Sequence, residues 1–166
     1  MSADRKMYGS TINLVNAGLV AGTTSTYTTT ATTVCSINGK FATGLTAQTN
    51  TATPTTDANT AAAFVAQTDN TACAYVFGVT AAGAIAVAQG PIEATEVGIT
   101  TTAGAFKSPP QFPTLPDNFC PIGYILVRTA PSAADFTFGT SNWTATGITA
   151  ATAVNVVVLP DRPQVS

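Results

Sequence analysis

Short runs of β-branched and aromatic residues recur along the chain at intervals of about 8–12 residues, and Gly, Pro or Asn closes each of them. The clearest runs lie at residues 73–79 (CAYVFGV) and 122–129 (IGYILVRT). Weaker runs are found at residues 84–87, 92–101, 136–140, 143–148 and 154–159. This spacing is typical of sandwiches and barrels. We therefore expect an all-β fold, an antiparallel sandwich or jelly-roll-like barrel, in a domain of residues 34–166.

The strongest turn signal is Asn38-Gly39, which stands between residues 34–37 (VCSI) and 40–43 (KFAT). Both residues accept the positive φ angles of a type I′ turn, whose twist matches two antiparallel strands. A β-hairpin is predicted here. Further along, Asp57 is a candidate N-cap for a short helix that continues through Ala61 to Val65.

Residues 1–33 lack the sharp strand signals of the rest of the chain. Their second half is the run 23–33 (TTSTYTTTATT), which has few bulky residues to specify a strand register. We expect residues 1–33 to form an extended N-terminal arm that contacts neighbouring subunits.

Residues 108–121 (SPPQFPTLPDNFCP) contain five prolines. Proline fixes φ and removes a ladder donor, so this stretch is predicted to cross the domain in an extended conformation. Phe112, Leu115 and Phe119 lie between the prolines as apolar contacts.

Composition favours association over catalysis. Thirty-two Thr and twenty-nine Ala residues stand against eight Asp or Glu, six Lys or Arg and no His. Thr suits half-buried sheet surfaces. Only 8% of residues are charged, against about a quarter in ordinary soluble domains. Since few like charges oppose contact, we expect partner molecules to cover much of the surface.

The same composition excludes several function classes. Without His, neither a Ser-His-Asp nor a Cys-His catalytic set can exist. Cys35, Cys73 and Cys120 form no CxxC pair, and they are expected to act as small buried hydrophobes in a reducing cytoplasm. Glu93 and Glu96 would face opposite sides of a strand. We expect no enzymatic activity, no catalytic residue, no cofactor and no metal site.

Nucleic acid and membranes are also not expected as partners. No basic cluster exceeds the Arg5-Lys6 pair and the net charge is −2, whereas neutralising several phosphates needs several cations on one face. The apolar stretch 12–21 is interrupted by Asn13, Asn16 and Gly18. It falls short of the roughly 20 residues that span a bilayer.

Two blocks of the sequence resemble known proteins. Residues 37–91 are similar to a recurrent segment of tailed-bacteriophage virion proteins, and residues 112–127 with 136–149 resemble the same group. The marks are Asn38-Gly39-Lys40, Pro54-Thr55-Thr56-Asp57, Phe64, Gly83, Gln89-Gly90-Pro91 and the Pro-rich block. This group includes capsid decoration (cement) proteins, head-fibre bases and tail-fibre segments. The resemblance implies a virion component and supplies no catalytic motif.

We therefore expect a bacteriophage capsid decoration protein, made in the host bacterial cytoplasm and located in the virion. It would act as a homotrimer that binds the major capsid protein on the outside of the head and bridges its subunits. Predicted contacts from the arm are Tyr8, Ile12, Leu14, Leu19 and Tyr27, and those from the Pro-rich seam are Phe112, Leu115 and Phe119. The alternative for the seam residues is that they fill the core of their own domain.

A second function class stays open, a head-fibre or tail-fibre receptor-binding module. It requires exposed aromatic side chains at one tip of the molecule, and Trp143 is the first candidate for a receptor contact.

Overall fold

The computed structural model describes residues 11–164, and within them all regular structure is antiparallel β. The small sheet has the order β1-β4-β5, the side sheet β2-β3-β6, and the main sheet β11-β10-β7-β8, with β12 paired to β10 and β9 to β7. The strands are β1 (Ile12–Asn13), β2 (Val20–Ala21), β3 (Thr26–Thr29), β4 (Cys35–Ile37), β5 (Lys40–Phe41), β6 (Gln48–Ala52), β7 (Thr71–Thr80), β8 (Ile85–Gln89), β9 (Glu93–Ala94), β10 (Phe119–Thr129), β11 (Ile148–Ala150) and β12 (Val154–Asn155). The predicted all-β, sandwich-like fold is confirmed.

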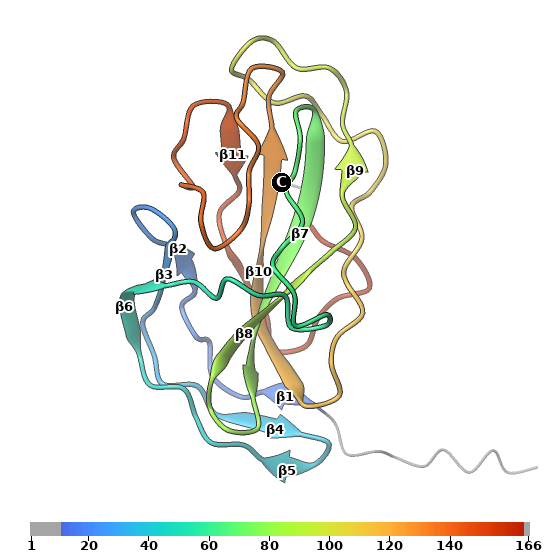
Figure 1. The fold of residues 1–166 in the computed structure, drawn as a ribbon. Helices are drawn as coiled ribbons and strands as arrows, with labels where there is room; N and C mark the ends of the chain where they lie inside the picture. Colours follow the sequence, from blue (N-terminus) through green and yellow to red (C-terminus); the bar gives the residue numbers. More distant parts are fainter. Residues whose placement is uncertain (1–10, 165–166) are drawn as a thin grey trace, which may run out of the picture.

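Strands β7 and β10 run side by side along the long axis of the molecule, and the small sheet lies across one end of them (Figure 1). Both central strands are buried on both faces, which is why they read as almost continuous apolar runs. One face of β7 contributes Cys73, Tyr75, Phe77 and Val79 to the larger core, together with Leu19, Tyr27, Phe136, Phe138 and Trp143 from the opposite layer. The other face packs under the Pro-rich segment and the chain after β11.

A β-bulge in β10 decides which of its side chains enter the larger core. The register against β7 shifts between Pro121, paired with Gly78, and Gly123, paired with Phe77. The extra residue is Ile122, and the alternation of faces changes phase there. Cys120 and Ile122 therefore share the larger core with Ile125 and Val127, while Phe119, Tyr124 and Leu126 face the other side.

Gly78 is required opposite this bulge. A Cβ atom at position 78 would lie 2.3 Å from Cζ of Phe119 and 2.7 Å from the carbonyl oxygen of Cys120. The Phe119 ring is only 3% exposed. Because Gly78 has no side chain, the Phe119 ring has room to pack against it at the end of the sheet.

The predicted hairpin is confirmed. Ile37 pairs with Lys40, and Asn38 and Gly39 have φ angles of 51° and 78°, as a type I′ turn requires. The predicted helix after Asp57 is wrong. Instead, the Asp57 carboxylate accepts hydrogen bonds from the backbone N–H of Thr60 and of Gln89, so it organises a tight turn and covers the open edge of β8.

The predicted arm is wrong for residues 11–33, which are part of the domain. Strand β1 pairs with β4, and β3 pairs with both β2 and β6. Threonine side chains supply the register that bulky residues would otherwise give, since Thr29 Oγ1 accepts from the Gln48 N–H and Thr33 Oγ1 from the Leu45 N–H. Residues 1–10, the first part of the predicted arm, lie outside the described residues.

Several weaker predicted strands are turns in the structure. Residues 92–101 contain only the short strand β9 and two isolated bridges, and between the bridge at Phe136 and the start of β11 at Ile148 the chain forms turns. Gly139, at a φ of 81°, reverses the chain between Phe138 and Trp143, so both aromatic rings enter the larger core without a strand ladder. Phe138 and Trp143, which were predicted to lie in strands, therefore lie in turns of the chain.

All three cysteines are free and buried. Burial raises the pKa of the Cys73 thiol to about 12, and the Cys73 Sγ donates to the carbonyl oxygen of Gly90. Burial likewise raises the pKa of the Tyr75 hydroxyl. The neighbouring Cys35 thiol, together with burial, raises the pKa of the Cys120 thiol above its ordinary value.

We predict that Gly78→Ala lowers the free energy of unfolding by roughly 1–3 kcal/mol, the usual cost of overpacking a core. Urea denaturation measures it. In a Phe119→Leu background, where the ring that blocks the new methyl group is gone, the same substitution should cost less. Equal costs in both backgrounds would contradict the assigned contact.

Alkaline pH should destabilise the fold through Cys73. The native thiol keeps its proton up to a pKa of about 12, whereas the unfolded thiol releases its proton near 9. The native state therefore binds more protons in this window, and the free energy of unfolding falls as pH rises, by up to about 1.4 kcal/mol per pH unit. Urea midpoints from pH 7 to 11 should show a shallower decline in Cys73→Ala; an unchanged slope would refute the assignment.

Candidate interface on the small sheet

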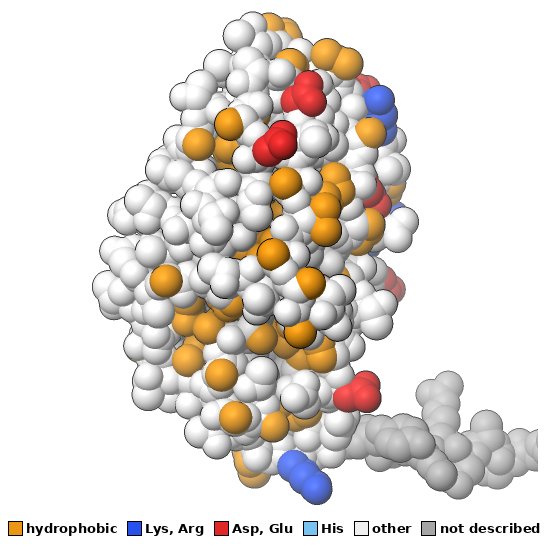
Figure 2. Space-filling view, viewed as in Figure 1, with side chains coloured by type: hydrophobic (Ala, Val, Ile, Leu, Met, Phe, Trp, Pro, Cys, Tyr) orange, Lys and Arg blue, Asp and Glu red, His pale blue; other side chains and the backbone are white. Residues whose placement is uncertain are grey.

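Most of the exposed large apolar side chains of the described residues lie near the small sheet or in the loop after β9; Val65 and Val20, which are 65% and 44% exposed, lie outside both places. Phe41 is 82% exposed, Leu14 54% and Val34 41%, and Val157 and Val158 nearby are 57% and 58% exposed. At the other site, Val97 and Ile99 are 77% and 79% exposed. Figure 2 shows hydrophobic side chains gathered most densely toward the end where the small sheet lies, with few charged groups among them.

The small sheet turns one apolar face inward and one outward. Ile12 pairs with Ser36, which pairs in turn with Phe41. Two residues after Ile12 and just beyond β1, the Leu14 N–H donates to the carbonyl oxygen of Val34. Residues two apart in a strand share a face. The outward set, here called the basal face, consists of Ile12, Leu14, Val34, Ser36 and Phe41, whereas the intervening Asn13, Cys35 and Ile37 are buried.

Buried polar contacts fix the orientation of this sheet. Asn13, fully buried, donates from Nδ2 to the carbonyl oxygen of Val156 and accepts from the Cys35 thiol. Its backbone N–H donates to Val157. The Asn38 N–H donates to Thr11 Oγ1, which ties the start of β1 to the hairpin turn. Because an unsatisfied buried Asn side chain is costly, β1 cannot rotate to turn Leu14 inward.

The basal face contains no ionisable side chain. Fully burying an exposed Val, Leu or Phe side chain contributes about 1.5–3 kcal/mol. Leu14, Val34 and Phe41 on one small surface therefore offer several kcal/mol to a partner that covers them. Exposed apolar patches of this kind mark interaction surfaces more often than isolated apolar residues do.

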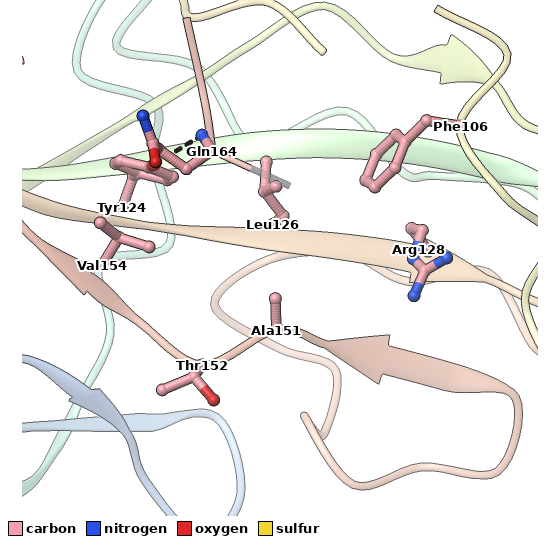
Figure 3. Close-up of a pocket in the computed structure, with 8 residues that line it drawn as sticks. All are labelled: Phe106, Tyr124, Leu126, Arg128, Ala151, Thr152, Val154 and Gln164. Carbon is pink, nitrogen blue, oxygen red and sulfur yellow. Dashed lines mark hydrogen bonds between the residues drawn. The ribbon is translucent and has the colours of Figure 1, made fainter. Parts of the chain in front are cut away.

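The cavities of the described region are less suited to be a site. The one shown in Figure 3 is about 30 Å³, room for about one water molecule. Arg128 lines it, but its guanidinium already donates to the Gly104 carbonyl oxygen and stacks 5.2 Å from the centre of the Phe106 ring. Tyr124 accepts from the Gln164 N–H there. These groups serve the packing of the sheet.

A wider hollow of about 330 Å³ lies beside Asp57, Val65 and Gln89. Asp57 is its only acid, and both carboxylate oxygens already accept hydrogen bonds, from Gln89 on one side and Thr60 on the other. The hollow thus follows from the turn that covers β8. In residues 11–164 no group of three or more His, Cys, Asp or Glu side chains is arranged to hold a metal ion.

The structure divides the predicted contact residues into two groups. Ile12 and Leu14 lie on the basal face, and Tyr8 lies outside the described residues. The prediction of intermolecular contacts is wrong for Leu19 and Tyr27, which are 0% and 1% exposed in the larger core. Tyr27 takes an inward position of β3, and Leu19 directly precedes β2, where the Asn155 side chain binds its backbone N–H and carbonyl groups.

The seam residues fill their own domain, as the alternative interpretation held. Phe119 is buried against Gly78, Phe112 packs edge-on against Tyr124 with ring centres 4.9 Å apart, and Leu115 packs beside the same cluster. Trp143 is only 4% exposed, and its indole N–H donates to the carbonyl oxygen of Thr26 at 2.8 Å. It is a core residue and not an exposed receptor contact.

Sequence reasoning missed Val34 and Phe41. The hairpin signal gave their pairing, but both faces of VCSI are partly apolar, and the pattern alone does not tell which face turns to the core. The buried Asn13, which breaks the apolar run of residues 12–21, was the available signal, because it marks the side of β1 that needs hydrogen-bond partners.

Comparisons with protein-family models, with curated proteins and with solved structures found no match to this chain. The described part of the chain also lacks any helix with the length and apolar character needed to cross a membrane. The functional proposal therefore rests on the geometry of the basal face.

We predict that Trp143 fluorescence will report a buried indole. It is the only Trp, so the native emission should be blue-shifted and weakly quenched by iodide, and both properties should change on unfolding in urea. Strong iodide quenching of the native protein would contradict the burial and reopen Trp143 as a contact residue.

Proposed function

We propose that this chain is a bacteriophage capsid decoration protein that binds the outer surface of the head and bridges neighbouring subunits of the major capsid protein. The observation that carries the proposal is the basal face, a mainly apolar sheet surface whose own residues carry no charge, at one end of the sandwich. The resemblance of residues 37–91 and 112–127 to phage virion proteins supports the same proposal.

The proposed mechanism is binding energy. A lattice protein that covers Leu14, Val34 and Phe41 removes apolar surface from water at every copy, and repeated copies across subunit joints add up over the shell. Low charge assists, because few like charges oppose dense packing of neighbours. We include a homotrimer in the proposal, since a protein with several equivalent basal faces can bridge several capsid subunits.

Copy number tests the function. In purified virions of the phage that encodes the chain, we expect a copy number of the same order as the major capsid protein, measured by quantitative mass spectrometry, and density over the head lattice by electron microscopy. A few copies confined to a fibre would support the receptor-binding alternative. Absence from virions would refute both.

The basal face is tested by substitution. Phe41→Ser should weaken binding to undecorated heads by roughly 10–100-fold, the effect of losing one buried Phe side chain at an interface. Ile99→Ser is the matched control, since Ile99 is 79% exposed in the loop after β9, and its affinity should stay unchanged. Both residues are exposed, so thermal unfolding should confirm intact folds. The opposite ranking would move the interface to that loop.

A further inference from the structure

The turn that joins β4 to β5 holds a chemically reactive pair, Asn38 and Gly39 (Figure 1). The backbone nitrogen of the residue that follows an Asn can attack the carbon of the Asn side-chain amide. Gly hinders this attack least, since it has no Cβ. No other Asn of this chain is followed by Gly. The hairpin signal in the sequence is therefore also a candidate site of covalent modification.

The reaction needs no partner besides water. The Gly39 nitrogen forms a bond to Cγ of Asn38, and Nδ2 of Asn38 leaves as ammonia with the proton that the nitrogen gives up. This step closes a five-membered succinimide ring. Water then opens the ring at one of its two carbonyl carbons. The product is either Asp or isoaspartate, in which the main chain runs through the former side chain, and both products have a carboxylate in place of the neutral amide.

The turn leaves both reacting groups accessible. Asn38 and Gly39 are exposed to solvent. The ladder bonds of a two-residue hairpin join the flanking residues, here Ile37 and Lys40. No acceptor among residues 11–164 binds the Gly39 N–H. Its nitrogen is therefore free to lose its proton to the solvent and to attack.

The closed hairpin nevertheless holds the two groups apart. In a type I′ turn the first central residue, here Asn38 with a φ of 51°, has a ψ of about +30°. Ring closure needs a large rotation about the Cα–C bond from this value. Two hydrogen bonds oppose the rotation: Asn38 Nδ2 donates to the Asp117 carbonyl oxygen at 3.2 Å, and the Asn38 N–H donates to Thr11 Oγ1 at 3.2 Å.

We propose that Asn38 is a site of spontaneous succinimide formation in this protein, and that the reaction proceeds when the hairpin opens locally. Local opening of an exposed turn requires much less free energy than global unfolding. The hydrogen bonds of Asn38 to Thr11 and to the Asp117 carbonyl oxygen then set the rate of the reaction. This proposal is independent of the capsid role.

The modification would loosen the small sheet. A carboxylate at position 38 has no N–H to donate, and it would face the Asp117 carbonyl oxygen as a second acceptor. The bond between the hairpin and the Pro-rich segment is then lost. Phe41 of the basal face lies in the same hairpin, three residues after Asn38. Deamidation would thus act on part of the basal face.

Incubation of the full-length protein in mildly alkaline buffer tests the site. Peptide mass spectrometry follows each Asn, and labelling by an isoaspartate methyltransferase measures the isoaspartate formed. Asn38 should convert while the protein stays folded, and roughly tenfold faster in urea, where no turn restrains it. Asn50 is the internal control, because it is exposed and has a φ of 46°, but Thr51 follows it. If Asn38 converts no faster than Asn50 in the folded protein, the site is wrong; equal rates in buffer and in urea would overturn the role of the hairpin.

A matched pair at position 11 tests the restraint. Thr11→Val removes the hydroxyl acceptor and keeps the shape of the side chain, so Asn38 should convert roughly 2–10-fold faster, the effect of one neutral hydrogen bond. Thr11→Ser keeps the hydroxyl group, and its rate should equal that of the unchanged protein. An unchanged rate in Thr11→Val, or the same increase in both variants, would overturn the assigned restraint.

The effect of the product is tested separately. Asn38→Asp imitates one product and should lower the urea midpoint, because the donor to the Asp117 carbonyl oxygen is lost. Asn50→Asp is the control, since the Asn50 side chain accepts a hydrogen bond from Thr26 Oγ1 and an Asp side chain keeps that acceptor. Equal midpoints in the two variants would overturn the predicted loosening of the small sheet.

Discussion

The antiparallel contact between β7 and β10 is the interaction on which the rest of the structure depends. The two strands pair from Ala72–Arg128 to Thr80–Phe119, and every other sheet segment attaches to them or packs on them. Both faces of this strand pair are buried, and its side chains are divided between two hydrophobic clusters, one on each face. The bulge at Ile122 divides the side chains of β10 between these clusters. The Phe119 ring then lies against Gly78, where the missing side chain leaves room for it.

The sequence predicted those parts of this arrangement whose signals act between residues close together in the chain. The two long strands and the Asn38-Gly39 hairpin were predictable, because dense β-branched runs and a positive-φ turn act within a few residues. The place of residues 11–33 was not predictable, because Thr-rich strands take their register from hydrogen bonds between Thr hydroxyl groups and a segment 12–22 residues away. Likewise, the strands predicted at residues 136–140 and 143–148 are mostly turns, because Phe138 and Trp143 reach the larger core from turns of the chain.

The candidate interface was predictable only in part. Ile12 and Leu14 were expected to be contacts for their position in an arm, yet they reach the surface because Asn13 between them is bound inside. Leu19 and Tyr27 belong to the same stretch of sequence and face the core. What separates the two pairs is the tertiary partner of each strand, since β1 forms the outer strand of a small sheet and β2 and β3 cover the larger core.

Scarcity of charge therefore has a specific structural meaning in this protein. Thr, Asn and Gln side chains form hydrogen bonds to backbone N–H and carbonyl groups inside the fold. The fold therefore requires few ion pairs. The same scarcity leaves the basal face itself without the lysines and acids that ordinarily keep exposed sheet surfaces apart, although Lys40 lies beside it in β5. A protein that had to stay monomeric in dilute solution would expose Phe41 and Leu14 at a disadvantage. For a protein whose neighbours are supplied at high local concentration, the same side chains are the means of binding.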